Sequence, residues 1–391
     1  MNYRISPQAA ALSPSLTLAI DARAKQMKAE GLDVVGFGAG EPDFDTPQHI
    51  KDAAKKALDE GFTKYTPSSG IPELRQAIAD KFRRENGLTY KPSQIIVSCG
   101  GKHSCFNTVL ATCGPGDEVI IPAPYWLSYP EMVKLAGARP VIVPTTDATE
   151  FKLTPEQLRA AITDRTRLLI LNSPSNPTGT VYTPAELRAL GEVCLEREVL
   201  IMSDEIYEHL LYDGAVHQSM ASFSPAHYAH TIVVHGFAKA WSMTGWRLGF
   251  LAAPEPVARA IDAIQSHSTS NPTSFAQKGA VAALTGPQDH LKVWLAEFAK
   301  RRTYAHQRLN AMPGITCVNA KGAFYLFPNI ARTGLKSAEF CARLLDEEKV
   351  AAVPGIAFGA DDYIRLSYAT SMTNIEKGLD RLERFVRRLV K

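Results

Sequence analysis

Short apolar runs alternate with helix-length amphipathic stretches through the middle of the chain, and this alternation restricts the possible folds more than any other feature. Between Ile95 and Ala252 the runs are IIVS, VIIP, VIVP, LLILNSP, VLIMS, TIVVH and RLGFLAA, and helix-like stretches follow the first four at 102–113, 126–136, 155–163 and 183–197. Short β-rich runs separated by helices are typical of βα units, which build a largely parallel sheet covered on both faces. We therefore predict an α/β fold with a mostly parallel sheet sandwiched by helices.

The two ends of the chain follow a different pattern. The last hundred residues alternate long helix-like segments with two strand-like ones, GAFYLFPNI and YIRLSYA, and the N-terminal region carries one helix-like segment over about 16–30. This is an α+β pattern, and 391 residues suit about two domains at roughly 150 residues per domain. We predict that residues 1–45 contribute to a small domain, 46–285 form the large domain and 286–391 complete the small one.

Composition and charge exclude several classes of partner. Lys and Arg number 43 against 40 Asp and Glu, and the charges are interspersed, so neither a nucleic acid nor an acidic membrane surface is indicated. The apolar runs are much shorter than the roughly 20 residues that cross a bilayer. Pro7 and Pro14 interrupt the N-terminal apolar residues, so no signal sequence is indicated. A small-molecule partner is favoured.

The cysteines point to the cytoplasm. The six cysteines form no CxxC pair, and their spacing fits neither a zinc site nor a disulfide framework. We expect reduced, mostly buried thiols. His227 and His230 are expected in a Pro-containing loop without a matching carboxylate motif, so no metal site is predicted.

Polar residues follow four of the predicted strands. Ligands of open α/β sheets bind beyond the carboxyl ends of the strands, where loops and helix N-termini converge. Gly100 and Gly101 come before a predicted helix, so their backbone N–H groups could approach a phosphate. A nucleotide-binding P-loop is excluded because Ile96 stands where its first glycine is needed. The glycines at 36, 38 and 40 precede Glu-Pro-Asp instead of a helix, which argues against a dinucleotide site.

The segment GFAKAWSMTGWRLG, residues 236–249, resembles the cofactor-lysine signature of the class I aminotransferases. Six further segments resemble this family in the same order, so the likeness spans nearly the whole chain: AGEPDFDTP, KYTPSSGIPELR, PAPYWLSYPEM, NSPSNPTG, SDEIYEHLLYDG and IRLSYAT. The likeness is strongest to the bacterial aspartate aminotransferase branch. It implies pyridoxal 5'-phosphate as the cofactor.

The resemblance assigns a role to each residue of the expected cofactor site. Lys239 would hold the cofactor aldehyde as a Schiff base and then move protons, which requires an amine that is partly neutral. Asp204 would face the pyridine nitrogen and keep it protonated. The other cofactor-binding residues are Tyr207 and Asn176 at the phenolate oxygen, Trp126 on the ring, Arg247, Gly100 and Gly101 at the phosphate, and Tyr65 from a neighbouring subunit.

Two neighbours of this site are also notable. Glu205, beside Asp204, is expected to point to the other side, as a solvated carboxylate or one that only supports its neighbour. Gly236 stands where some relatives carry a phosphate-binding serine, so Arg247, the glycine loop and a partner residue would have to suffice. The role of Tyr65 implies a homodimer with shared sites.

The resemblance also implies the substrate contacts. Arg365 would clamp the α-carboxylate with its planar guanidinium, near a backbone group of Gly40, and Lys102 would contact a second carboxylate. The remaining substrate-binding candidates are Trp126, Asn176 and, in the N-terminal loop, Ser15 and Thr17. Ser13 replaces a lysine found in some close relatives, which removes one possible charge for that second carboxylate.

The predicted partners are amino acids and 2-oxo acids. The expected reaction converts L-aspartate and 2-oxoglutarate to oxaloacetate and L-glutamate, and prephenate could also be converted to arogenate. An aminotransferase for aromatic or other amino acids is an alternative. A lyase or synthase with the same cofactor is another, because the cofactor residues alone do not determine the reaction path.

Overall fold

A computed structural model describes residues 3–13 and 16–390 of the chain. Its largest sheet has seven strands in the order β2-β8-β7-β6-β5-β3-β4. The bounds are β2 (Ile95–Ser98), β3 (Glu118–Ala123), β4 (Arg139–Pro144), β5 (Thr166–Asn172), β6 (Leu200–Asp204), β7 (Thr231–Gly236) and β8 (Gly249–Ala252). Strands β3 to β7 run parallel, and β8 lies antiparallel between β2 and β7. The predicted fold class is confirmed, and the RLGFLAA run forms the antiparallel exception.

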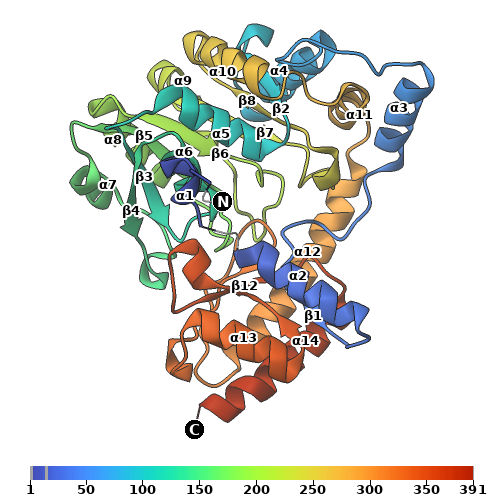
Figure 1. Cartoon of the computed structure of the whole chain (residues 1–391), viewed down its shortest axis with the longest axis vertical. Helices are drawn as coiled ribbons and strands as arrows, with labels where there is room; N and C mark the ends of the chain where they lie inside the picture. The colour runs from blue at the N-terminus through green and yellow to red at the C-terminus, as the bar shows by residue number, and fades with distance from the viewer. Residues whose placement is uncertain (1–2, 14–15, 391) are drawn as a thin grey trace.

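Helices cover both faces of this sheet (Figure 1). Successive strand residues point to opposite faces. Val234 and Leu251 therefore pack with the layer formed by α5 (Gly101–Thr112), α6 (Ser128–Leu135) and α10 (Glu255–Ser268). Val233 and Phe250 pack with the opposite layer, formed by α4 (Pro72–Asn86) and α11 (Ser274–Thr285). Helices α7 (Pro155–Ala161) and α8 (Pro184–Glu196) cover strands β5 and β6.

Local sequence explains where several of these helices begin and end. Thr154 and Thr183 cap α7 and α8, each with a Gln or Glu three residues later that completes a capping box. Gly87 ends α4 with a left-handed φ of 66°. The remaining helices of this part are α3 (Gln48–Asp59) and α9 (Pro225–His230). His227 and His230 belong to α9, so the prediction of a loop is wrong: Ser224 caps this short helix and Pro225 suits its first turn.

The C-terminal elements form a second layered unit. They are α12 (Asp289–Asn310), β9 (Tyr325–Leu326), α13 (Ser337–Glu348), β10 (Val350–Ala351), β11 (Val353–Pro354), β12 (Ile364–Ser367) and α14 (Met372–Leu389). Strands β11, β12 and β9 form an antiparallel sheet. The strand-like GAFYLFPNI is only two residues of strand, because Ala323 has a positive φ of 57° and Pro328 has no N–H to donate.

The N-terminal region packs with this C-terminal unit. Strand β1 (Val35–Gly36) pairs in parallel with β10, and Ala24 and Met27 of helix α2 (Leu16–Ala29) pack on Leu345 and Ala351. Figure 1 shows the blue α2 beside the orange and red C-terminal elements. The short helix α1 (Pro7–Ala10) instead lies against α6. The domain boundaries at 45/46 and 285/286 remain predictions.

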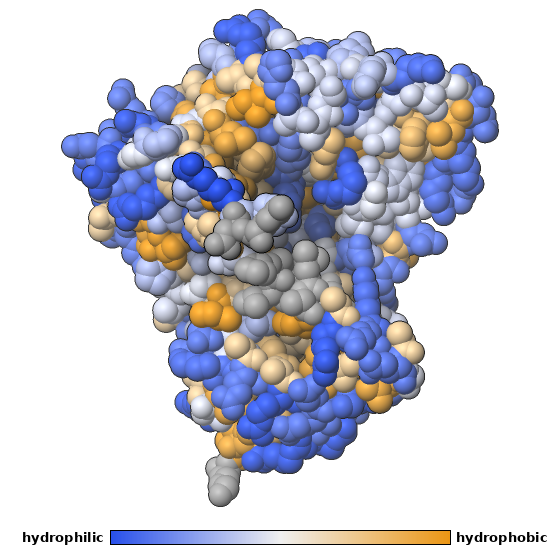
Figure 2. All heavy atoms as spheres, viewed as in Figure 1, coloured by the Kyte–Doolittle hydropathy of each residue, from blue (hydrophilic) through white to orange (hydrophobic). Residues whose placement is uncertain are grey.

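Two further expectations concern the whole chain. All six cysteines are free and five are buried, while Cys99 is half-buried. Over residues 3–13 and 16–390, no helix combines the length and apolar character that a membrane crossing needs. Figure 2 shows mostly hydrophilic atoms on one face, with an apolar patch beside the N-terminal helix.

Candidate active site

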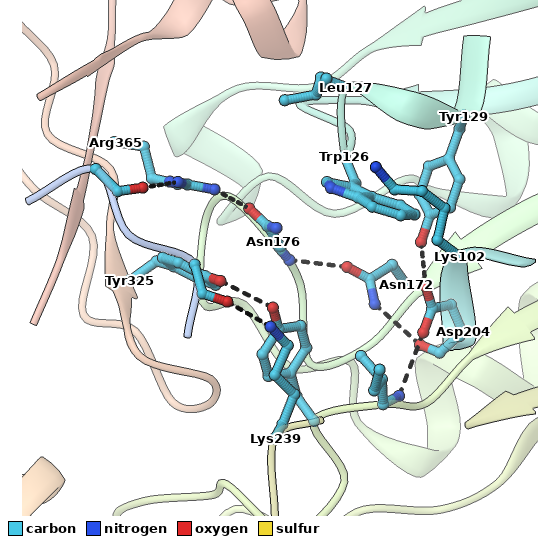
Figure 3. Close-up of a pocket in the computed structure, with 15 residues that line it drawn as sticks. Lys102, Trp126, Leu127, Tyr129, Asn172, Asn176, Asp204, Lys239, Tyr325 and Arg365 are labelled. Carbon is cyan, nitrogen blue, oxygen red and sulfur yellow. Dashed lines mark hydrogen bonds between the residues drawn. The ribbon is translucent and has the colours of Figure 1, made fainter. Parts of the chain in front are cut away.

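A cavity of about 320 Å³ lies at the carboxyl ends of β5, β6 and β7, where the C-terminal unit meets the sheet (Figure 3). Ligand sites of α/β sheets are expected at this edge, because loops and helix N-termini converge there. The lining residues are Gly38, Gly40, Gly101, Lys102, Trp126, Leu127, Tyr129, Asn172, Asn176, Asp204, Ile206, Tyr207, Lys239, Tyr325 and Arg365. The cavity therefore brings together chain segments more than 300 residues apart in sequence, such as Gly38 and Arg365.

Lys239 lies in the loop after β7, and its side chain points into the cavity. Its amine donates a hydrogen bond to the carbonyl of Gly40 and lies 5.5 Å from the ring centre of Tyr207. Burial, and then the positive charge of Arg365, lower the pKa of this amine to about 8. With a pKa of about 8, roughly a tenth of the amine is neutral at pH 7, and this fraction can act as a nucleophile.

Asp204 ends strand β6 and is buried at the floor of the cavity. The hydroxyl of Tyr129 donates to its carboxylate at 2.5 Å, and the backbone N–H of Ile206 donates at 3.3 Å. Burial raises the pKa of this carboxyl group, although the bond from Tyr129 opposes the shift. Within the described part of the chain no Lys, Arg or His forms an ion pair with Asp204. The carboxylate is therefore available to a cationic N–H group of a ligand.

The N-terminus of α5 and Arg247 form the basic end of the site. Gly100 has a φ of 91°, and a Cβ there would lie 2.6 Å from a guanidinium nitrogen of Arg247. A Cβ on Gly249 would lie 2.2 Å from the nitrogen of Gly101. Only glycines allow the helix start, the arginine and β8 to approach so closely. Burial, followed by the charge of Arg247, lowers the pKa of Lys102. An anion is favoured where two cations and a helix N-terminus converge.

Strand geometry also accounts for Gly236, which by the family resemblance stands where some relatives carry a serine. Gly236 pairs with Gly249 across β7 and β8. A Cβ on Gly236 would lie 3.1 Å from the Cα of Gly249 and 3.3 Å from the carbonyl of Leu248. The tight strand pairing therefore leaves little room for a side chain here.

Arg365, on β12, reaches into the cavity from the C-terminal unit. Its guanidinium donates to the side-chain oxygen of Asn176 at 3.0 Å and to the carbonyl of Gly38 at 2.7 Å. Its Nε atom is buried and has no hydrogen-bond partner among the described residues. The guanidinium carbon lies 4.6 Å from the ring centre of Tyr325, a cation–π contact. This arginine can donate further hydrogen bonds to a carboxylate.

Three polar side chains of the cavity, Asn172, Tyr129 and Tyr325, were not singled out as site residues from the sequence. Asn172 accepts from the backbone of Asn176 at 2.8 Å, Tyr129 reaches Asp204, and the hydroxyls of Tyr207 and Tyr325 lie 2.9 Å apart. Asn172 directly precedes the polar loop after β5, so its place at a strand end was a usable signal. Tyr129 and Tyr325 carry no comparable local signal.

The predicted site residues fall into three groups. The structure brings together in the cavity Gly40, Gly101, Lys102, Trp126, Asn176, Asp204, Tyr207, Lys239 and Arg365, with Gly100 and Arg247 at its edge. Tyr65 is 91% exposed and lies outside the cavity of its own chain. Ser15 lies outside the described residues, and Thr17 belongs to α2 without a described side chain. The individual roles of these residues remain predictions.

Of the two alternatives expected for Glu205, a solvated carboxylate is wrong, and a carboxylate that supports its neighbour agrees with the structure. Glu205 is buried, accepts hydrogen bonds from Ser203 and Ser219, and lies 3.0 Å from His217. The nearby Glu208 forms a buried ion pair with the ammonium of Lys81. Burial is tolerated because each carboxylate is paired or hydrogen-bonded. These contacts anchor the turn that carries Asp204 and Tyr207.

Comparisons with known proteins agree with this geometry. The family model "Aminotransferase class I and II" matches residues 32–382. The chain is 53% identical over 388 residues to an aspartate aminotransferase of Geobacillus stearothermophilus, with 98% of this chain and 99% of that protein covered. It is 50% identical over 392 residues to an aspartate/prephenate aminotransferase of Cereibacter sphaeroides, with 97% and 98% covered. The solved structure of the Thermus thermophilus aspartate aminotransferase with maleate matches with a TM-score of 0.93 and 44% identity, covering 98% of this chain and all of that one.

Proposed function

Because the chain belongs to the class I and II aminotransferase family, we propose that it exchanges the amino group between L-aspartate and 2-oxoglutarate with pyridoxal 5'-phosphate as its cofactor. One observation carries the proposal. A lysine amine with a pKa of about 8 and a buried carboxylate without an ion-pair partner among the described residues line one cavity. Arg365 lines the same cavity, and its buried Nε has no hydrogen-bond partner among the described residues.

The donor set of the cavity fits the cofactor. Lys239 would bind its aldehyde carbon, Asp204 would accept from its ring nitrogen, and Arg247 with the N-terminus of α5 would hold its phosphate. Tyr207 and Asn176 offer hydrogen bonds to its ring oxygen, and Trp126 offers an aromatic face. When bound, the cofactor supplies an electron sink that stabilises negative charge at the substrate Cα. The protein orients the cofactor and the substrate. It also supplies a carboxylate whose negative charge pairs with a protonated ring nitrogen, and an amine that can hold or release a proton.

The substrate contacts follow from the two ends of the cavity. Arg365 would exchange its bonds to Asn176 and Gly38 for a bidentate pair with the α-carboxylate. Lys102 lies 5.0 Å over the ring of Trp126, on the basic side of the cavity. This position suits a second carboxylate, and maleate, which is named with the Thermus thermophilus structure, is also a dicarboxylate. A dicarboxylic substrate is therefore favoured.

Lys102→Ala is expected to lower kcat/KM selectively for dicarboxylic substrates. Loss of one ion pair in a partly buried site lowers kcat/KM for aspartate by roughly 10- to 100-fold, while a monocarboxylic amino acid changes by less than about threefold. Steady-state kinetics with aspartate and with alanine measure the difference. Equal losses for both substrates would contradict the role of Lys102.

We also propose that the enzyme is a homodimer with shared sites. Tyr65 is too exposed to act within its own chain, and the likeness to the family places it at the partner's phosphate. An apolar hollow of about 470 Å³ opens beside Arg247, and it is lined in part by Leu12, Phe106 and Met132. Apolar surface of this kind next to a binding site supports an interface there.

Intersubunit complementation tests the shared site. Lys239→Ala chains and Tyr65→Ala chains are refolded together. The concentration of pyridoxal 5'-phosphate is kept so low that most of the Tyr65→Ala protein binds none. Random pairing makes half the dimers hybrid, each with one intact site, so about a quarter of the wild-type activity should return. Activity no higher than the average of the two separate variants, or a monomer in sedimentation, would contradict the proposal.

A substrate screen tests the function itself. The purified protein is incubated with pyridoxal 5'-phosphate, a panel of amino donors and several 2-oxo acids, and both new products are measured. Matched formation of oxaloacetate and glutamate supports aspartate transamination. Arogenate formed from prephenate would add the second activity that the Cereibacter sphaeroides relative's name carries. Ammonia or elimination products without a new amino acid would support a lyase instead.

A further inference from the structure

The carboxylate of Asp204 is held by two side chains that the proposed reaction does not use. Tyr129 of α6 donates its hydroxyl proton at 2.5 Å, and the thiol of Cys105 on α5 lies 3.8 Å from the same oxygen. Both side chains are buried. Figure 3 shows Tyr129 reaching Asp204 on the side of the cavity that carries Trp126. The two helices thus support the carboxylate from behind the cavity.

Few charges act on this carboxylate. The titratable groups that face it are Tyr129, Cys105, Glu205, Tyr207 and Lys239. Lys239 is the positive member of this set, and its amine donates to the carbonyl of Gly40. Burial disfavours the carboxylate anion, so the neutral donors that touch it must offset that cost. The bond from Tyr129 is the shortest of these contacts and lies at the short end of the range for O–H···O⁻ bonds.

We propose that Tyr129 is a positioning residue that keeps Asp204 ionised and aimed at the ring nitrogen of the cofactor, with Cys105 as a weaker second donor. The inference rests on the proposed function, because it concerns the carboxylate that would face the cofactor. A buried carboxylate and a pyridine nitrogen can share a proton in two ways. With the proton on the nitrogen the two groups form an ion pair, and with the proton on the carboxyl group they form a neutral pair. Hydrogen-bond donors to the carboxylate stabilise the ion pair, whereas the neutral pair does not need them. The hydroxyl of Tyr129 therefore favours the ion pair, which is the form that withdraws electrons.

The same tyrosine also supports the aromatic face of the site. Its ring meets the indole of Trp126 edge to face, with centroids 5.2 Å apart and an interplanar angle of 85°. Tyr129→Phe keeps this ring contact and removes only the hydroxyl. The variant therefore separates the hydrogen bond from the packing.

The test is the protonation state of the ring nitrogen. Wild type and Tyr129→Phe are loaded with pyridoxal 5'-phosphate that carries ¹⁵N in the ring, and the ¹⁵N resonance is recorded. The wild-type resonance is expected at the protonated position. In Tyr129→Phe the ratio of ion pair to neutral pair should fall roughly 10- to 100-fold, as expected for one hydrogen bond to a charged group. The resonance should move toward the unprotonated position, and kcat should fall while KM for aspartate changes less than about threefold.

Two matched variants complete the design. Cys105→Ala should move the resonance in the same direction but less, because a thiol at 3.8 Å is a weak donor. Tyr212→Phe removes a buried hydroxyl that donates to the carbonyl of Ala323 at 2.6 Å, away from the cavity, and should leave the resonance unmoved. An unmoved resonance in Tyr129→Phe, with the same loss of thermal stability as Tyr212→Phe, would overturn the inference. A wild-type protein that takes up no cofactor would instead overturn the proposed function.

Discussion

Lys239→Ala is expected to remove the visible absorption band of the cofactor-loaded protein and to lower the rate of amino transfer by at least about 10³-fold. Two functions are lost together. The amine that would bind the aldehyde is gone, and so is the group that would move protons at the substrate Cα. Absorbance spectra after cofactor addition and steady-state rates measure the two effects. An unchanged spectrum would contradict the role of Lys239 as anchor.

The fold should survive this substitution. The pKa of Lys239 is lowered from 10.5 to about 8, so between these values the unfolded chain binds a proton that the folded chain has lost. Stability of the cofactor-free protein therefore rises with pH across this window, and below pH 8 the buried ammonium costs free energy. Removing the amine relieves that cost, so Lys239→Ala without cofactor should melt no lower than wild type at pH 7. Lys300→Ala, at an exposed position on α12, is the matched control and should keep both band and rate.

Asp204→Asn is expected to lower kcat by roughly 10²- to 10³-fold. The amide has the same shape and can still accept one hydrogen bond, but it carries no negative charge to hold a protonated ring nitrogen. The cofactor should still bind, because Lys239 and the phosphate end of the site are unchanged. Kinetics together with the ring ¹⁵N resonance separate this electronic loss from a loss of binding.

Glu205→Gln is the matched control for Asp204→Asn. Both carboxylates are buried and adjacent, but Glu205 contacts Ser203, Ser219 and His217 outside the cavity. Its substitution should lower thermal stability and leave the ring nitrogen protonated. If Asp204→Asn kept full activity, or if Glu205→Gln gave the same loss of kcat, Asp204 would not be the carboxylate that serves the cofactor.

Much of the central sheet was predictable because its signals are local. Short apolar runs in the strands, capping residues such as Thr154 and Thr183, and glycine at helix ends act within a few residues of each other. The order of strands and helices from β2 to β8 follows from them. The direction of β8 did not follow, because an apolar run does not record whether its neighbours run parallel or antiparallel.

The candidate site was partly predictable for a related reason. Asp204 ends a strand, and Gly100 and Lys239 follow within three residues of one, a position that marks them as residues of the ligand edge. Tyr129 lies 75 residues from the Asp204 it contacts, and Arg365 lies 327 residues from Gly38. Helical periodicity marks Tyr129 only as a core residue. The burial of Glu205 could not be predicted, because Ser219 and His217 come from a later segment that folds back onto it.

By itself the sequence determined the succession of elements, the glycines at positions of close backbone approach, and the residues that carry the proposed chemistry. Each of these depends on near neighbours along the chain. Only the tertiary structure decided that the amine of Lys239 is partly neutral at neutral pH, that Asp204 has a hydroxyl behind it, and that Arg365 reaches the sheet edge. These properties depend on burial and on charges brought together across long stretches of chain. Burial and the electrostatic field at an atom arise from the packed whole, and no local pattern contains them.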